Sequence, residues 1–379
     1  MIALLLLVLL AAIFFYIILN ADIPGLWKFF IIFAEMAVVG RILIKRYKLP
    51  SELGLILIKS KYGMQIIEDL AKKQKMFIFM TEIGNVIAYG LASRLFIKDG
   101  SIKSTVIGLA LLGFIVALVA PTAFVFLFEV IKIGSTGKVT AISGDAGYFP
   151  IIVGLGLLIG GLTLFIISAI IFYGGVVLSG MINEYVFGIE TLSNIAPGGT
   201  FLLPGINLPL FEGIIALIII MAVHEGSHAA LTRMARVRLL SSGIVLFGII
   251  PVGAFIEPDE EQLSKVHGIK QSRVLIAGPT ANLLAAILFF IIFFGMTLFI
   301  KSTDVLEYEI VKDIVKFVYI TCGLTFALNF VVGAVNLLPL PLFDGFRLID
   351  VNIKNKLIVN GLMYLTLFFF LLNFLPWFF

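Results

Sequence analysis

Long apolar runs recur along the whole chain and constrain its fold more than any other feature of the sequence. A helix needs about 20 mostly apolar residues to cross the hydrocarbon core of a bilayer, which is about 30 Å thick. Of the 379 residues, 61% are hydrophobic and 13% are charged, whereas a soluble domain is about half apolar and about a quarter charged. Soluble, fibrous and disordered proteins are therefore excluded. Runs of this kind lie at 1–20, 24–44, 77–97, 105–130, 150–180, 211–232, 274–300, 314–336 and 357–379.

These runs predict an all-α, polytopic membrane protein with about eight or nine transmembrane helices. Two of the runs are doubtful as membrane spans. The run at 77–97 contains Glu82, Asn85 and Arg94. The run at 24–44 contains Lys28, Glu35 and Arg41, so it could lie in the membrane interface instead of crossing the bilayer. Residues 1–200 form an amino-terminal membrane region to which the sequence assigns no role.

The charges between the runs predict how the chain is oriented. Cytoplasmic loops carry an excess of Lys and Arg. Segment 45–76 has eight basic and three acidic residues, while segment 301–313 has two basic and four acidic residues. The first should be cytoplasmic and the second outside. The net charge of +4 fits this excess of cytoplasmic Lys and Arg and does not indicate nucleic-acid binding. We therefore expect a multi-pass protein of the plasma membrane. Its partner would be the lipid bilayer, and we expect no nucleic-acid partner.

Segment 45–76 is also amphipathic. Met64, Ile67 and Leu70 recur at helical spacing, opposite charged residues. A helix with one apolar and one charged face is typical of a segment that lies on a membrane surface. We therefore expect a helix here on the cytoplasmic surface.

The sixth run contains the candidate catalytic residues, in the sequence His224-Glu225-Gly226-Ser227-His228. Two histidines four residues apart lie on one face of a helix, one turn apart, so both rings can reach one metal ion. Glu225 is close enough to take a proton from a water molecule that the metal activates. This is the HExxH arrangement of zinc peptidases. Polar residues that only pack helices together are the alternative, but charged groups within a membrane are costly.

The depth of this motif follows from the rise of a helix. If the run enters the membrane near Phe211, His224 lies 13 residues farther along, or about 20 Å at about 1.5 Å per residue. In a core of about 30 Å, the histidines should then lie about 10 Å from the cytoplasmic face. The active site is therefore expected toward the cytoplasmic side.

A catalytic zinc ion takes three protein ligands and leaves a position open, so a third ligand must come from elsewhere. His267 is one candidate and an acidic residue is the other. Pro339 and Pro341 should end or unwind the eighth run. Irregular backbone at membrane depth must be buried in protein or line a wet cavity. Asp344 follows on this broken segment, at the depth predicted for the histidines.

A short β element is expected between the sixth and seventh runs. Residues 242–256 are apolar and rich in β-branched side chains, and Gly and Pro bound them, which is typical of short strands. An exposed strand edge beside the metal would let a substrate bind in an extended form. A strand pair that merely seals the cavity is the alternative, and the sequence leaves both open.

Three motifs in this order resemble the site-2 protease family of intramembrane zinc metalloproteases, over roughly 200–350. Phe343 and Phe346 depart from the family pattern, which usually has leucine and often glycine there. The connection after the sixth run is too short for an inserted PDZ domain and the chain ends in a run, so a minimal form without PDZ or nucleotide-sensing domains is expected. The motifs are His224-Glu225-Gly226-Ser227-His228, Gly278-Pro279-Thr280-Ala281-Asn282 and Asn336-Leu337-Leu338-Pro339-Leu340-Pro341-Leu342-Phe343-Asp344-Gly345.

The resemblance implies a set of roles for these residues. His224, His228 and Asp344 would bind a single Zn2+, and Glu225 would be the general base. Asn282 and Asn336 would help position the substrate backbone. From the residues alone, helix-to-helix hydrogen bonding is an equally good interpretation of both asparagines.

We therefore expect residues 201–379 to form an intramembrane zinc metalloprotease core. It would hydrolyse peptide bonds within or near the transmembrane segment of another membrane protein. A membrane metal transporter and a catalytically inactive binding platform are the alternatives. A protease of the prenyl-processing type would share the HExxH helix but use a different third ligand. The sequence does not indicate the oligomeric state.

Overall fold

The computed structural model describes residues 2–60, 62–117, 149–199, 202, 204–205, 207–307 and 309–378. These residues form two compact units, and each unit takes segments from both halves of the sequence. The first unit comprises residues 1–74, 202–266 and 284–330, and the second comprises residues 75–201, 267–283 and 331–379. The expected functional boundary near residue 200 stays a prediction.

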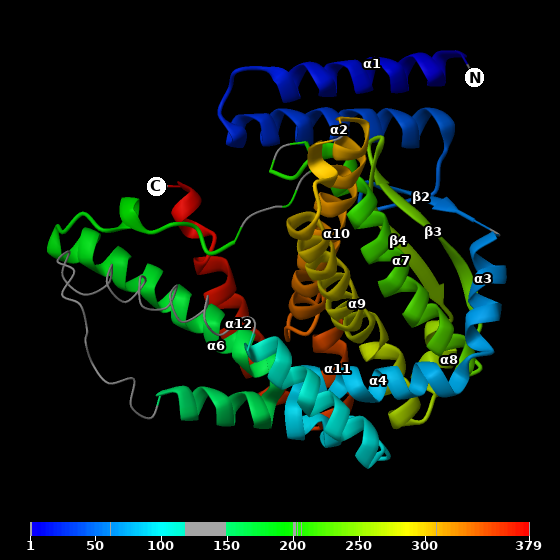
Figure 1. The fold of residues 1–379 in the computed structure, drawn as a ribbon, viewed down its shortest axis with the longest axis vertical. Helices are drawn as coiled ribbons and strands as arrows, with labels where there is room; N and C mark the ends of the chain where they lie inside the picture. The colour runs from blue at the N-terminus through cyan, green and yellow to red at the C-terminus, as the bar shows by residue number, and fades with distance from the viewer. Residues whose placement is uncertain are drawn as a thin grey trace. The chain divides into compact units, whose positions relative to one another are not determined.

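The first unit combines helices with a small sheet (Figure 1). Two of its helices, α9 and α10, continue into the second unit. Its elements are α1 (Ile2–Asn20), α2 (Gly25–Tyr47), β1 (Ser51–Glu52), β2 (Leu55–Lys59), α3 (Tyr62–Ala71), α7 (Leu210–Met234), β3 (Leu239–Phe247), β4 (Ile250–Pro258), α8 (Glu260–Ser264), η3 (Val305–Glu307) and most of α9 (Gly268–Ser302) and α10 (Glu309–Val335).

The sheet has four antiparallel strands in the order β1-β2-β3-β4. The hairpin of β3 and β4 confirms the short strands predicted at 242–256. Within β4, Gly253 pairs with Val245 and Pro251 with Leu246, so Val252 is an extra residue at a bulge. β4 is one of the two edge strands of the sheet, the other being β1, and β4 lies beside α7 (Figure 1).

Segment 45–76 is only partly the expected helix. The amphipathic pattern correctly predicts α3, but residues 51–59 form β1 and β2. Four consecutive apolar residues, 55–58, suit a strand that pairs with a partner, and β2 pairs with β3 through Ile56 and Leu246. Glu68 of α3 also forms an ion pair with Arg233 of α7, at 2.6 Å.

The second unit is helical. Its long helix α6 kinks at Gly161, where φ is 61°. Its elements are α4 (Gln74–Tyr89), η1 (Gly90–Leu95), a helix at Ile102–Ala117, α6 (Phe149–Phe187), η2 (Leu192–Asn194), α11 (Asp344–Asn352), α12 (Lys356–Leu372), η4 (Leu375–Phe378), the first part of α9 and the end of α10.

Seven helices among the described residues are long and apolar enough to cross a membrane. They confirm an all-α polytopic architecture with a short β element. The run at 24–44 does form a helix, α2, but it is not among the seven, because it carries too many charged residues for a membrane span. The run at 105–130 is described only to residue 117. The described helix, Ile102–Ala117, is shorter than a membrane span, and the rest of the run lies outside the described residues.

The backbone between α10 and α11 is irregular, as the two prolines predict. It turns back on itself, because the Gly345 N–H donates to the Asn336 carbonyl at 2.8 Å. Gly345 lies in the first turn of α11 and is buried. A Cβ atom at this position would overlap the Leu337 carbonyl group. Glycine is therefore needed here for close packing, and that packing holds the neighbouring residue Asp344.

We predict that Gly345→Ala destabilises the protein, because the added methyl group would push against backbone that cannot move aside. Overpacking typically costs about 1–3 kcal/mol. The melting temperature of the detergent-solubilised protein should fall by several degrees.

Gly361→Ala is the matched control. Gly361 lies in α12, where a Cβ atom would meet nothing within 4 Å. Alanine is favoured over glycine in a helix by about 1 kcal/mol, so this variant should melt at the wild-type temperature or above it. Equal melting temperatures for the two variants would contradict the packing described for Gly345.

Candidate metal centre

Helix α7 brings two imidazole rings together. His224 and His228 are one turn apart, and their Nε2 atoms lie 3.2 Å from each other. The ring centroids are 4.8 Å apart and the rings are inclined at 67°. Two ring nitrogens directed at one point in this way can bind the same metal ion. His228 is 9% exposed, and His224 and Asp344 are partly buried.

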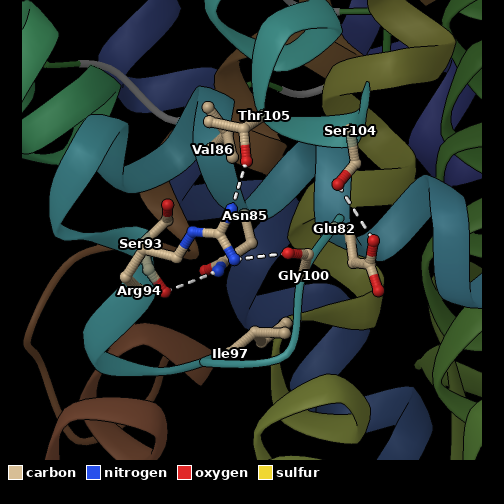
Figure 2. A pocket seen from close by; sticks show the side chains of 9 residues that line it. All are labelled: Glu82, Asn85, Val86, Ser93, Arg94, Ile97, Gly100, Ser104 and Thr105. Carbon is tan, nitrogen blue, oxygen red and sulfur yellow. Dashed lines mark hydrogen bonds between the residues drawn. The ribbon is translucent and has the colours of Figure 1, made fainter. Parts of the chain in front are cut away.

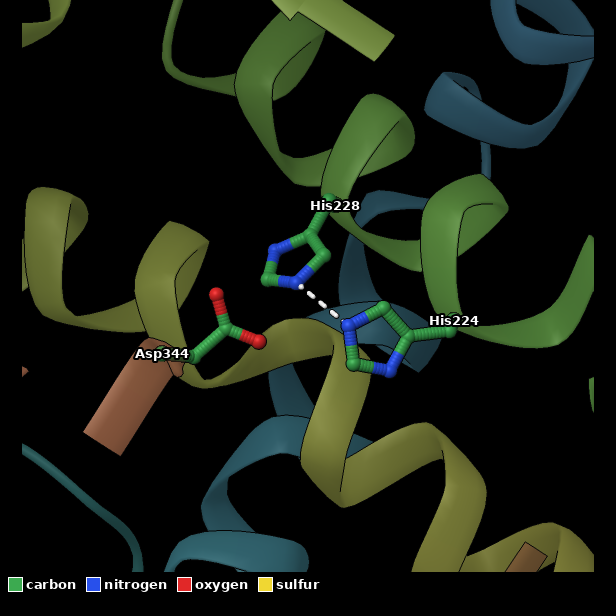
Figure 3. Close-up of side chains that lie close together, drawn as sticks. All are labelled: His224, His228 and Asp344. Carbon is green, nitrogen blue, oxygen red and sulfur yellow. Dashed lines mark hydrogen bonds between the residues drawn. The ribbon is translucent and has the colours of Figure 1, made fainter. Parts of the chain in front are cut away.

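Asp344 completes the group as the first residue of α11. Figure 3 shows its carboxylate directed toward the two imidazole rings. One ligand atom from each of His224, His228 and Asp344 can be chosen so that all lie within 4.8 Å of one another. Within the described part of the chain this is the one group of three or more such residues that could hold a metal. His267, the other candidate, is exposed and does not belong to the group.

The chemistry of these donors fits zinc. Two imidazole nitrogens and one carboxylate oxygen are a ligand set of catalytic zinc sites, in which three protein ligands leave a position for water or substrate. Calcium and magnesium prefer oxygen ligands alone, and a zinc site built on thiolates would need cysteines. The single cysteine, Cys322, is not part of the group. Zinc binding by this group stays a prediction.

Glu225 adjoins His224 in α7 and is partly buried. The next residue, Gly226, has open space on its Cα, because a Cβ atom there would meet nothing within 4 Å. Helix α7 therefore carries a carboxylate next to His224, followed by a position with open space. A group that accepts a proton in a hydrolytic site needs both proximity and access.

The two asparagines differ in their surroundings. Asn282 is fully buried in α9, and a Cβ atom on Gly333 of α10 would lie 3.1 Å from its Cβ. Asn336 directly follows α10 and is partly buried, and its side-chain amide donates to the Val332 carbonyl of α10 at 2.9 Å. Asn282 thus lies at a tight contact between helices. A substrate-positioning role stays a prediction for both residues.

Polar residues in the run at 77–97 take on a different meaning in the structure. The sequence pattern suggests only that they weaken a membrane span. In α4, Glu82 is 8% exposed and Asn85 is 2% exposed, so both are buried in protein. Buried polar groups in a membrane helix are costly unless they have partners, and this cost is the signal by which they could have been found.

Comparison with known proteins places the metal-binding candidates in a family. Residues 212–374 match the model of Peptidase family M50. An uncharacterized protein of Methanocaldococcus jannaschii is 36% identical over 94 residues, which are 25% of this chain and 26% of that protein. The match thus spans about a quarter of the relative's length. No solved structure matches the chain. The stretch that matches the model of Peptidase family M50, the site-2 protease family, contains His224, His228 and Asp344, and we call residues 212–374 the peptidase-family region.

Proposed function

We propose that the protein is an intramembrane zinc metalloprotease that hydrolyses peptide bonds within or near the transmembrane segment of another membrane protein. The observation that carries this proposal is the group of His224, His228 and Asp344 inside the peptidase-family region. The apolar helices around it support a site within the membrane. A metal transporter would need metal-binding groups along a path to both faces, and the described residues offer one group.

His224, His228 and Asp344 would hold the metal, with Glu225 beside them. Zinc bound there would supply a Lewis acid that makes water more acidic and polarises a carbonyl group. The Glu225 carboxylate would accept the proton of the attacking water and pass it to the leaving amine. Gly226, the next residue in α7, has open space where a side chain would lie, and we propose that substrate uses this space.

The sheet supports an extended mode of substrate binding. Peptide bonds in a helix are protected by its hydrogen bonds, so a helical substrate must unwind before it can be cut. Strand β3 is paired on both sides, whereas β4 has one paired side and lies next to α7. An edge strand can accept an extended peptide by backbone hydrogen bonding. We propose that the substrate segment adds to β4.

We further propose that the site faces the cytoplasmic side of the plasma membrane and that residues 201–379 are the protease core. The excess of Lys and Arg in segment 45–76 supports the orientation. The partners would be the bilayer and a membrane-protein substrate, with no nucleic acid.

The purified protein should contain about one zinc ion per chain, the number that a catalytic site of this ligand set takes. His228→Ala removes one of three ligands and should reduce the zinc content severely, because two ligands bind the ion poorly. Metal analysis after dialysis against a weak chelator measures the difference. His267 is exposed and lies outside the group, so the His267→Ala variant should retain zinc as the wild type does. Equal losses in the two variants would count against the assigned ligands.

Glu225→Gln should keep zinc and lose cleavage of a single-span test substrate. The amide cannot accept a proton, and general-base catalysis contributes about 10²–10⁴ in rate. Glu212→Gln, in the first turn of the same helix, is the matched control and should cleave normally. Cleavage that survives Glu225→Gln would refute the mechanism. Zinc movement across vesicles by Glu225→Gln protein would favour a transporter.

Substrate addition to β4 predicts where cross-links form. In a Cys322→Ser, Glu225→Gln background, Val252→Cys should form a disulfide with a substrate that carries one cysteine near its scissile bond. Val252 lies at the bulge of β4 and is 42% exposed. Leu240→Cys is the control, since Leu240 is 52% exposed but belongs to the inner strand β3. Stronger cross-linking at residue 240 would rule out binding along β4.

A further inference from the structure

The amino-terminal region contacts the peptidase-family region in each of the two units. In the second unit, Glu82 of α4 pairs with Arg273 of α9 at 2.9 Å. Figure 2 shows the same carboxylate accepting a hydrogen bond from Ser104 in a small polar pocket. These contacts hold helices together. In the first unit the contacts reach the β3–β4 hairpin instead, and β4 is the strand to which the substrate segment is proposed to add.

Helix α2 lies at the closed end of this hairpin (Figure 1). The ring of Phe33 packs against the ring of Phe247, with the two centroids 4.9 Å apart. Phe247 is the last residue of β3 and pairs with Ile250, the first residue of β4. An aromatic side chain of α2 therefore packs directly on the residues that join the two strands.

The backbone of α2 touches the hairpin as well. A Cβ atom on Gly40 of α2 would lie 3.3 Å from the backbone nitrogen of Gly248. Gly248 lies in the turn of the hairpin with a φ of 64°, in the left-handed region that favours glycine. A Cβ atom on Gly248 would overlap Met36 of α2. The turn and the helix thus fit together with no room for a side chain between them.

An apolar core joins the same parts of the first unit. It contains Val39 and Leu43 of α2 and Ile56 of β2, and Leu246 and Ile249 of the hairpin pack against it. Strand β2 also pairs with β3 along residues 56–59. The amino-terminal region therefore holds the hairpin in two ways, through β2 along β3 and through α2 at the turn. The unpaired edge of β4 is on the other side of the hairpin.

The position of this edge matters for substrate binding. A peptide that adds to a strand must align its backbone N–H and C=O groups with those of the strand. The bulge at Val252 lies two residues after Ile250, so a movement of the turn would carry the edge of β4 with it. The apparent affinity for substrate is then reduced by the fraction of molecules in which β4 is out of place.

Resting on the proposed function, we propose that Phe33 is a positioning residue for substrate binding. Through Phe247 it keeps the closed end of the hairpin, and with it the edge of β4, where the substrate segment needs it. Phe33 lies outside the peptidase-family region. Helix α2 would then supply a part of substrate binding that this region lacks.

Phe33→Ala tests this proposal. Binding is measured in full-length Glu225→Gln protein, as the dissociation constant of a fluorescently labelled single-span substrate in detergent. An aromatic pair typically contributes a factor of about 2–10 to an equilibrium constant, so the dissociation constant should rise by about this factor. Phe33→Tyr keeps the ring and should bind substrate as the parent protein does. The zinc content should be the same in all of these variants, because the metal site is unchanged.

Phe30→Ala is the matched control. Phe30 belongs to the same helix and is 47% exposed, against 52% for Phe33, and its ring packs against Trp27 and Phe29 within α2. This variant should bind substrate normally. Phe247→Ala should weaken binding, and adding Phe33→Ala to it should weaken binding no further, because Phe33 acts through Phe247.

An unchanged dissociation constant in Phe33→Ala would overturn the proposal, and so would an equal rise in Phe30→Ala. Additive losses in the double variant would overturn it too, because the two rings would then act separately. A rise that accompanies loss of zinc would show a general disturbance of the protein and would also count against the proposal. A wild-type protein that neither binds nor cleaves single-span substrates would refute the proposed function itself, which separates the two failures.

Discussion

The cost of placing polar groups within a membrane governs the rest of this structure. In hydrocarbon a polar side chain or a broken helix must find partners within the protein. This chain places two histidines and a glutamate in α7 and breaks its backbone between α10 and α11. The broken segment turns tightly around Gly345 and presents Asp344 to the histidines. A metal ion bound there would satisfy all three ligands at once, which helix packing alone would not do.

The same constraint explains the amino-terminal polar residues. Glu82 and Arg273 are almost completely buried and form an ion pair. Removing one partner of a buried pair typically costs about 3–5 kcal/mol, so each side chain keeps the other in place. Arg273 precedes the motif at 278–282 in α9. The ion pair therefore ties the amino-terminal region, to which sequence assigns no role, to a helix of the peptidase-family region.

Features set by local sequence could be predicted, and those set by distant contacts could not. Hydropathy predicts the spans, Pro339 and Pro341 predict the end of α10, and the spacing of His224 and His228 predicts a shared helical face. The pairing of β2 with β3 joins segments almost 200 residues apart. The strand propensity of a segment does not identify the strand with which it pairs. The partner of Glu82 is hidden for the same reason, since only the fold brings Arg273 to it.

X-ray absorption at the zinc edge of the purified protein tests most directly whether His224, His228 and Asp344 hold one zinc ion. We expect nitrogen and oxygen ligands alone, at about 2.0–2.2 Å, with the outer-shell scattering of two imidazoles. A sulfur ligand at about 2.3 Å, which only Cys322 or a methionine could supply, would contradict this assignment. So would a spectrum without imidazole scattering.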